Sequence, residues 1–159
     1  MKLVQTQMLS PLGSLYLVAS EQGLRALHFD SPGHAPLVPG ESATPQSRIL
    51  AQAVRELSEY FQGQRREFQV PLDLEGTPFQ KRVWKELLRI PYGQTVSYSQ
   101  IARRIQQAQA VRAVGTANGK NPVCIIVPCH RVIAADGTLG GYSQGLDRKT
   151  QLLALEQRV

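Results

Sequence analysis

The chain has 159 residues, enough for one substantial domain or two small ones, and its 42% hydrophobic content can build a core. Eighteen Lys and Arg against twelve Asp and Glu give a formal charge of +6, which suits a polyanionic partner such as nucleic acid, although a protein with merely a basic surface would share it. No apolar stretch approaches the ~20 residues of a membrane span and no signal peptide is recognisable, so we expect a cytoplasmic protein with reduced cysteines and no membrane partner.

The first half of the chain is predicted to be a small α+β unit without a catalytic constellation. Three segments of alternating apolar residues, separated by glycine-containing turns, predict a β-meander over residues 2–9, 14–20 and 24–29. Prolines and glycines make residues 30–45 a loop. Apolar positions with helical spacing predict a helix over residues 46–62, and residues 67–72 are a further strand candidate.

Residues 73–77 are interpreted as a linker, which divides the chain into domains 1–73 and 74–159. Thr77 is a good N-cap and Pro78 a good first helical residue, so the second domain is predicted to begin with a helix.

Two shorter helices, residues 97–105 and 109–118, are predicted next, and the tight turn between them is typical of a helix-turn-helix. Small residues dominate the second helix, and they would let its backbone approach either DNA or another part of the protein. Its only long charged side chain, Arg112, could enter a base stack, contact a phosphate or be an ordinary solvated arginine.

The clearest chemistry lies where an apolar run ends at Pro128 and is followed by Cys129, His130 and Arg131. The run predicts a buried strand that stops at the proline, because proline cannot donate to a ladder. Cys129 would lie at the mouth of the core, where nearby cationic groups favour the nucleophilic thiolate. Contact with His130 would require a bend, since neighbouring strand residues point to opposite faces.

A reactive cysteine also needs a base, a group that orients the base, and shelter from water. Glu156, on a helix predicted over residues 147–157, could fold back to orient His130. A glycine-rich loop over residues 140–145 could close over a ligand, and it lacks a phosphate-loop motif. Cys124 and Cys129 have neither redox nor zinc spacing, so we expect no metal and no cofactor, and we interpret Cys124 as a core thiol.

Several motifs of the second half occur in a recognisable order: Tyr98, Arg112-Ala113-Val114-Gly115, Asn121-Pro122, Pro128-Cys129-His130-Arg131-Val132 and Gly141-Tyr142-Ser143. Their order and spacing resemble those of the O6-alkylguanine-DNA alkyltransferases, also called methylated-DNA–protein-cysteine methyltransferases. The match runs from about residue 77 to residue 156, and the first half matches only in layout. The resemblance implies an α+β fold, with a small N-terminal α/β domain of ribonuclease-H-like layout and a C-terminal winged-helix-like helix-turn-helix domain.

The resemblance implies direct DNA repair, in which an alkyl group moves irreversibly from O6-alkylguanine in duplex DNA to Cys129, once per protein molecule. O4-alkylthymine is a further candidate substrate. The helix-turn-helix would bind the minor groove, the damaged base would flip out of the stack, and Arg112 would fill its place. His130, acting through a water with Glu156 behind it, would take the thiol proton.

The same resemblance assigns the remaining site residues. Tyr98 would rotate the nucleotide or protonate the departing guanine, and Asn121 would hold the turn before the active-site strand. The DNA-binding set is Tyr98, Arg112, Ala113, Gly115, Thr116, Ala117, Asn118 and Arg131. The base pocket comprises Val127, Pro128, Tyr142, Ser143 and Gln144. The partner is duplex DNA that contains the lesion, bound by a monomer, with cooperative assembly left open.

Two places depart from the family pattern. A Gly-x-Pro turn usually precedes the second helix of the pair, whereas residues 105–109 read Ile-Gln-Gln-Ala-Gln, which predicts a longer or differently shaped turn. In the glycine-rich loop, Gln144 replaces the first glycine of Tyr-Ser-Gly-Gly, and it would strain the loop if that position has a positive φ.

Three other functions compete with repair. An alkyltransferase-like protein binds the same lesions without repairing them, but such proteins carry tryptophan in place of the cysteine. A thiol hydrolase built on Cys129 and His130 would lack an oxyanion motif and leave the helix-turn-helix unexplained. A transcription regulator would need base-reading side chains that the second helix lacks, and Cys129 would have no role.

Overall fold

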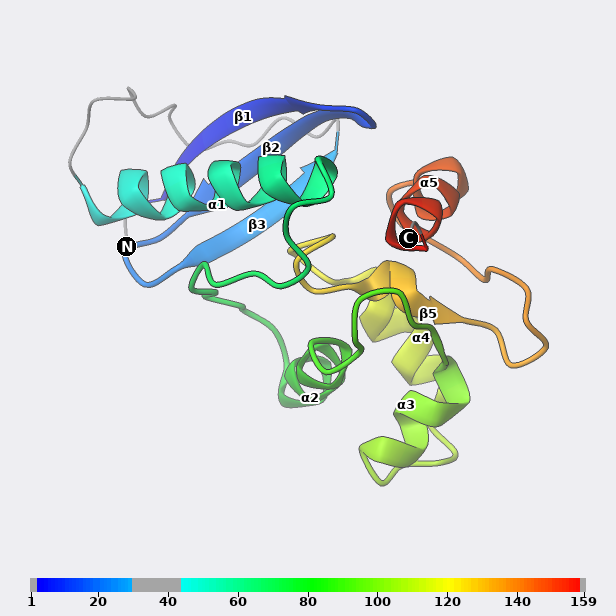
Figure 1. Cartoon of the computed structure of the whole chain (residues 1–159). Helices are drawn as coiled ribbons and strands as arrows, with labels where there is room; N and C mark the ends of the chain where they lie inside the picture. The colour runs from blue at the N-terminus through cyan, green and yellow to red at the C-terminus, as the bar shows by residue number, and fades with distance from the viewer. Residues whose placement is uncertain (1–2, 30–43, 158–159) are drawn as a thin grey trace. The chain divides into compact units, whose positions relative to one another are not determined.

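The computed structural model describes residues 3–29 and 44–157, and the chain forms two compact units, Met1–Glu75 and Gly76–Val159 (Figure 1). Along the chain the elements are β1 (Val4–Ser10), β2 (Gly13–Ala19), β3 (Leu24–Phe29), α1 (Pro45–Phe61), α2 (Pro78–Leu87), β4 (Val96–Ser97), α3 (Tyr98–Arg104), α4 (Val111–Gly119), the 3-10 turn η1 (Cys129–Arg131), β5 (Val132–Ile133) and α5 (Leu146–Glu156). A small sheet unit followed by a mainly helical unit confirms the predicted α+β class. None of the described helices is long and apolar enough to cross a membrane.

The first unit is an antiparallel sheet with the strand order β1-β2-β3, and α1 packs on it (Figure 1). The predicted meander is confirmed, because alternate residues of β2 such as Leu15 and Leu17 are fully buried. The predicted helix is also confirmed, with Thr44 as its N-cap, accepting a hydrogen bond from the backbone N–H of Ser47. The loop predicted over residues 30–45 falls mostly on residues 30–43, outside the described part of the chain.

The strand predicted over residues 67–72 is wrong, apart from a single bridge between Leu72 and Leu24. A buried carboxylate explains the difference: Glu56 Oε1 accepts hydrogen bonds from the backbone N–H groups of Gln69 and Val70, at 2.9 and 3.1 Å. These donors are therefore satisfied by a side chain of α1 instead of a neighbouring strand.

The second unit is organised around α2, α3 and α4. Thr77 and Gln80 form a reciprocal capping box at the start of α2, and Ser97 caps α3 in the same way. Trp84 of α2 is buried, and its Nε1 donates to the backbone carbonyl of Ala117 in α4 at 2.8 Å. The predicted helix-turn-helix corresponds to α3 and α4, and its turn contains Gln106 in the left-handed conformation, with a φ of 62°.

A two-stranded parallel sheet fixes the two segments that matter most for the site. Val96 of β4 pairs with Val132 of β5, so the start of α3 lies beside the residues that follow the cysteine. Tyr98 comes directly after β4, and η1 comes directly before β5. The short sheet therefore brings the helix-turn-helix and the cysteine segment together.

Candidate active site

The buried apolar segment before the cysteine is a compact turn, which corrects the predicted strand. The N–H of Ile126 donates to the carbonyl of Cys124 at 2.7 Å, across Ile125, whose φ is 70°. The N–H of Cys129 donates to the carbonyl of Val127 at 2.8 Å, across Pro128 with φ −81° and ψ 65°. Both are γ-turns, and the first requires a positive φ that a β-branched residue rarely adopts.

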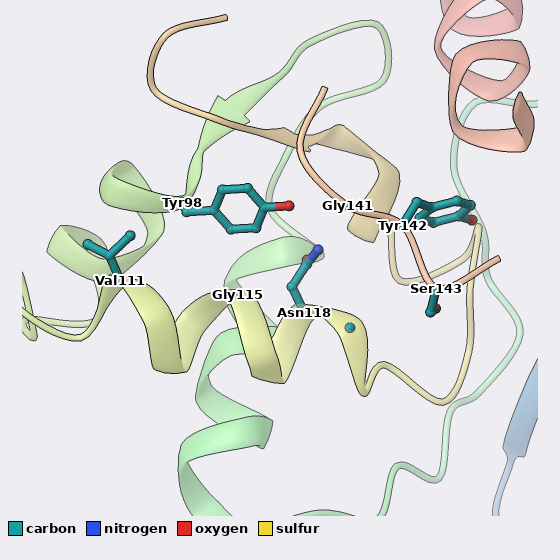
Figure 2. Close-up of a pocket in the computed structure, with 8 residues that line it drawn as sticks. Tyr98, Val111, Gly115, Asn118, Gly141, Tyr142 and Ser143 are labelled. Carbon is teal, nitrogen blue, oxygen red and sulfur yellow. The ribbon is translucent and has the colours of Figure 1, made fainter. Parts of the chain in front are cut away.

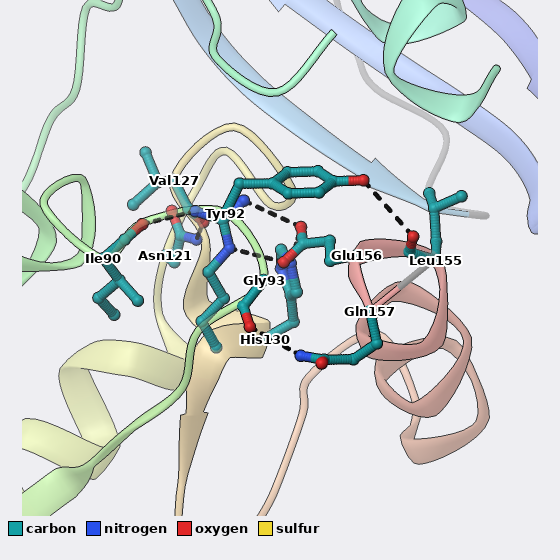
Figure 3. Close-up of polar contacts among 10 residues, drawn as sticks. Ile90, Tyr92, Gly93, Asn121, Val127, His130, Leu155, Glu156 and Gln157 are labelled. Atoms are coloured by element: carbon teal, nitrogen blue, oxygen red, sulfur yellow. Dashed lines mark hydrogen bonds and ion pairs between the residues drawn. The ribbon is translucent and has the colours of Figure 1, made fainter. Parts of the chain in front are cut away.

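Asn121 closes this turn from the side. Its Nδ2 donates to the carbonyl of Val127 at 2.8 Å (Figure 3). Its Oδ1 accepts from the N–H of Val123 at 3.0 Å. Both ends of the carboxamide are thus used to hold residues 121–127 in one conformation. The chain then enters η1, where Cys129 and His130 are both buried.

Cys129 is a thiol at neutral pH in the resting protein. Burial raises the pKa of its thiol to about 11, outweighing the hydrogen bond from Asn121 and the positive charge of Lys149, which lower it. A nearby cation does favour the thiolate, as expected, but the effect of burial on the pKa is larger, so the thiol form dominates. Reaction requires a base that takes the proton from sulfur.

His130 and Glu156 form a buried pair, with 2.7 Å between His130 Nε2 and Glu156 Oε2 (Figure 3). Burial favours a raised pKa for Glu156, but hydrogen bonds from His130 and Arg131 lower it to about 2, so the carboxylate is ionised. Burial lowers the pKa of His130 despite the carboxylate, so the imidazole is neutral at pH 7. A carboxylate can only accept, so a neutral His130 must donate through Nε2 and carry its lone pair on Nδ1.

The lone-pair nitrogen is the one suited to act as a base. His130 Nδ1 is buried and has no hydrogen-bond partner among the described residues. The pair with Glu156 leaves this nitrogen unprotonated and holds the ring in place, which is the arrangement that general-base catalysis needs.

Arg131 has a different place from the one predicted for a DNA contact. Its guanidinium is buried, and it donates from Nε to Glu156 Oε1 at 2.8 Å and from Nη1 to the carbonyl of Ile90 at 2.6 Å. It also lies 5.7 Å from the centre of the Tyr92 ring. Arg131 is therefore unavailable to a phosphate and instead fixes the carboxylate that orients His130.

Lys149 is a residue of the site that sequence reasoning missed. Its side chain is fully buried, and Nζ donates to three backbone carbonyls, those of Val132, Leu139 and Gly141, at 2.7, 2.5 and 3.1 Å. Burial lowers its pKa to about 8. One signal was available, because Lys149 shares the buried face of α5 with Leu152 and Glu156. A lysine at such a position is expected to be paired.

A hollow of about 570 Å³ lies between the helix-turn-helix and the glycine-rich loop (Figure 2). Its lining residues are Tyr98, Val111, Gly115, Asn118, Gly119, Gly141, Tyr142 and Ser143. Tyr98 reaches across it, and a hydrogen bond with the backbone of Gly141 joins its hydroxyl to the loop. Gly140 has a φ of 71°, and a Cβ there would lie 2.9 Å from the Tyr98 hydroxyl, so this contact requires glycine.

The remaining predicted DNA contacts separate into two groups. Arg112, Ala113 and Thr116 are exposed on α4, where a duplex can reach them. Ala117 is buried and its carbonyl accepts from Trp84 Nε1, so its side chain does not lie on the exposed face of α4.

The predicted base pocket is only partly assembled in the hollow. Tyr142 and Ser143 line it, whereas Val127 and Pro128 are buried in the turn. Gln144 does not have the positive φ that would strain the loop, since among the described non-glycine residues only Gln106 and Ile125 do.

The helix-turn-helix lines a hollow together with the glycine-rich loop, as in a nucleic-acid-binding protein. The buried thiol and the histidine–glutamate pair beside it add the chemistry of a reactive cysteine. Residues 78–158 match the model of the 6-O-methylguanine DNA methyltransferase DNA binding domain, and residues 3–74 match the ribonuclease-like domain of the same enzyme. The chain belongs to the 6-O-methylguanine DNA methyltransferase family, which confirms the resemblance of its motifs.

Similar proteins support the assignment along the whole chain. A methylated-DNA–protein-cysteine methyltransferase of Mycolicibacterium paratuberculosis is 50% identical over 94% of this chain and 89% of its own length. One from Methanosarcina acetivorans is 46% identical over 92% of this chain and 94% of its own. The crystal structure of Mycobacterium tuberculosis OGT in complex with DNA superposes with a TM-score of 0.86 and 46% identity, covering 99% of this chain and 93% of that one.

Proposed function

We propose that the protein repairs alkylated DNA directly, by transferring the alkyl group of O6-alkylguanine in a duplex to Cys129. The single observation that carries the proposal is a buried thiol next to a neutral histidine, whose Nε2 is tied to Glu156 and whose Nδ1 is free to accept a proton. Family membership gives this arrangement its substrate. O4-alkylthymine is a second candidate substrate.

The reaction is a displacement at the alkyl carbon. A bond forms between that carbon and Cys129 Sγ while its bond to guanine O6 breaks. The thiol proton passes to His130 Nδ1 through a water molecule, and the departing guanine is reprotonated, with Tyr98 as the donor. The product is a thioether, which is a poor leaving group and has no route back to a thiol, so each molecule reacts once.

Duplex DNA is the partner that the charge distribution favours. Residues 76–159 hold twelve Lys and Arg and four Asp and Glu, a formal charge of +8, whereas residues 1–75 hold six and eight, a charge of −2. Positive charge is thus concentrated in the unit that carries the helix-turn-helix, as contacts with phosphates require. Arg112, exposed on α4, would fill the space of the extruded base.

The proposal includes several further features. The protein binds DNA as a monomer in the cytoplasm, and Asn121 keeps the turn before Cys129 in its reactive shape. Residues 1–73 form the N-terminal α/β domain, and residues 74–159 form the domain that carries the reaction. The non-repairing alternative is not favoured, because Cys129 supplies the acceptor that such proteins lack.

A direct test incubates the protein with a duplex that contains one O6-methylguanine and identifies the modified peptide by mass spectrometry. We expect one methyl group on the Cys129 peptide and none in Cys129→Ser. Cys124→Ser is the matched control, since Cys124 is also a buried free thiol, and it should still accept one methyl at Cys129. Repeated turnover by one molecule would contradict the single-use mechanism.

The role of Arg112 has its own test. Arg112→Ala should slow transfer from the duplex far more than transfer from the free O6-methylguanine base, which needs no extrusion. Equal losses on both substrates would remove Arg112 from the extrusion step.

A further inference from the structure

The helix that is proposed to bind the damaged duplex, α4, carries little of the positive charge of its unit. It contains one basic residue, Arg112. Residues 78–106, which include α2 and α3, hold six Lys and Arg against one Glu, a formal charge of +5. Most of the positive charge therefore lies outside α4, and the contact proposed for Arg112 does not account for it.

Three of these basic residues form a stripe along α2 and the turn that follows it. Arg82, Lys85 and Arg89 are spaced by three and four residues, so they lie on one face, and all three are exposed. The opposite face of α2 is buried, and its Trp84 donates to the carbonyl of Ala117 in α4. The stripe therefore points away from α4, and a duplex that lies on α4 alone would leave it unoccupied.

The end of α3 adds a fourth cation and makes the surface concave. Arg104 and the stripe border a hollow of about 290 Å³, together with Glu86. Arg82 is fixed at this hollow, because its Nη2 donates to the carbonyl of Ile105 at 2.5 Å. The four cations of the α2–α3 basic surface are Arg82, Lys85, Arg89 and Arg104.

Carboxylates neutralise little of this surface. Among the described residues that line the hollow only Glu86 is acidic, and it pairs with Arg89 at 3.4 Å. Arg82, Lys85 and Arg104 form no ion pair with a carboxylate in the described part of the chain. Four cations against one acid leave a formal charge of +3, which attracts a polyanion.

The chemistry of the α2–α3 basic surface favours the phosphate backbone of a duplex over other polyanions. Three of the four cations are arginines, whose planar guanidinium suits phosphate oxygens. None of the described residues that line the hollow is aromatic, whereas single strands and protein partners are commonly held by aromatic side chains. We propose that the α2–α3 basic surface binds a second segment of duplex DNA while α4 holds the first.

A protein with two such contacts passes from one segment to another without becoming free in solution. The second segment binds before the first has left, so competitor DNA takes part in the dissociation of the first. This inference goes beyond the proposed function, because neither segment needs to carry a lesion and no group of the surface takes part in alkyl transfer.

The dissociation of a fluorescently labelled, lesion-free duplex tests the inference. The unaltered protein, bound to this duplex, is mixed with unlabelled duplex at rising concentration and constant ionic strength, because phosphate contacts depend on salt. With two contacts the dissociation rate rises with the concentration of competitor. With one contact the rate is the same at every concentration.

The variant Lys85→Gln/Arg89→Gln/Arg104→Gln removes three cations of the surface and keeps Arg82, which donates within the protein. Its dissociation rate should no longer depend on competitor. Methyl transfer from the free O6-methylguanine base to Cys129 should be as fast as in the unaltered protein.

The matched control removes three exposed cations from α1 and the segment after it, as Arg48→Gln/Arg55→Gln/Arg66→Gln. It has the same net charge as the first variant and should keep the dependence on competitor. Binding to a single short duplex should change equally little in both variants, and thermal unfolding shows that both are folded.

A rate that does not depend on competitor in the unaltered protein would overturn the second contact, whatever the variants do. So would a dependence that survives in the first variant or is lost equally in the control. Weaker binding to the single duplex in the first variant alone would place the surface on the same duplex as α4. Acceleration by polyglutamate but not by duplex DNA would assign it to an acidic protein, and either result would overturn the proposal. A protein that exchanges between duplexes but forms no thioether at Cys129 would keep this inference and lose the proposed function.

Discussion

Arg131 holds Glu156 by both carboxylate oxygens, with 2.8 Å from Nε to Oε1 and 2.9 Å from Nη2 to Oε2. His130 shares the second oxygen at 2.7 Å. All three side chains are buried. Arg131 therefore fixes the carboxylate of Glu156, which in turn orients the imidazole of His130. Loss of any one of the three side chains should disturb the other two.

Loss of the carboxylate should destabilise the protein strongly. Glu156→Gln leaves the Arg131 guanidinium buried without its counter-charge, which costs about 3–5 kcal/mol in such sites. Unfolding in urea measures the loss. Asp147→Asn, which removes an exposed acid from the first turn of the same helix, should cost less than about 1 kcal/mol. Similar losses in both variants would contradict a special role for the buried pair.

Methyl transfer should depend on pH through His130. Burial lowers the pKa of its imidazole below the ordinary 6.5, so the neutral base predominates at pH 6.5 and above and disappears as the pH falls through the lowered value. The rate with saturating DNA should be level near neutrality and decline in acid. His130→Gln should react about 10²- to 10⁴-fold more slowly and lose this decline. An unchanged acid limb in that variant would assign the titration to another group.

Lys149 should control the glycine-rich loop and the acidity of Cys129. Lys149→Met keeps a long side chain but leaves three carbonyls without their donor, so faster hydrogen exchange is expected at residues 139–141. The pKa of Cys129 should rise further, because the positive charge of Lys149 lowers it. The rate of thiol alkylation by iodoacetamide against pH measures that change.

A control for this substitution is available on α2. Lys85→Met removes an exposed ammonium from α2 and should alter neither hydrogen exchange in the loop nor thiol acidity. Loop exchange that is unchanged in Lys149→Met would show that the three carbonyl contacts do not hold the loop.

The turn between α3 and α4 should be stabilised by glycine at one position only. Gln106 has a φ of 62°, a conformation that costs a side-chain-bearing residue about 1–2 kcal/mol. Gln106→Gly removes this strain, but glycine also increases the conformational entropy of the unfolded chain and so cancels part of the stabilisation. We expect a net increase of about 1 kcal/mol in the free energy of unfolding. Gln107→Gly, one residue further on and without a positive φ, should be destabilising. Thermal unfolding of the two variants distinguishes them.

Local signals explain why most helices could be predicted. Thr77 and Ser97 mark the starts of α2 and α3, because each forms a capping box with the glutamine three residues later. The turn before Cys129 could not be predicted in the same way, because an apolar run fits a strand as well as a buried turn. Its shape depends on the side chain of Asn121 and on the positive φ of Ile125, which composition does not reveal.

The positions of the charged side chains in the site are determined by partners that are distant in the sequence. The contact between His130 and Glu156 is predicted by the place of Glu156 on a C-terminal helix and by the family resemblance. The burial of Arg131 was not, because one of its partners is the carbonyl of Ile90, 41 residues earlier. Lys149 likewise donates to backbone carbonyls. Because every residue has a carbonyl, these partners could not be predicted from the sequence.

The position of α5 has a consequence for how the protein matures. Cys129 and His130 leave the ribosome before Lys149 and Glu156 have been synthesised, and only α5 supplies the carboxylate that orients the imidazole. A nascent chain therefore holds a thiol without its working base. The pairing of this thiol with an oriented imidazole therefore waits until the last helix of the chain has been made and has folded against η1.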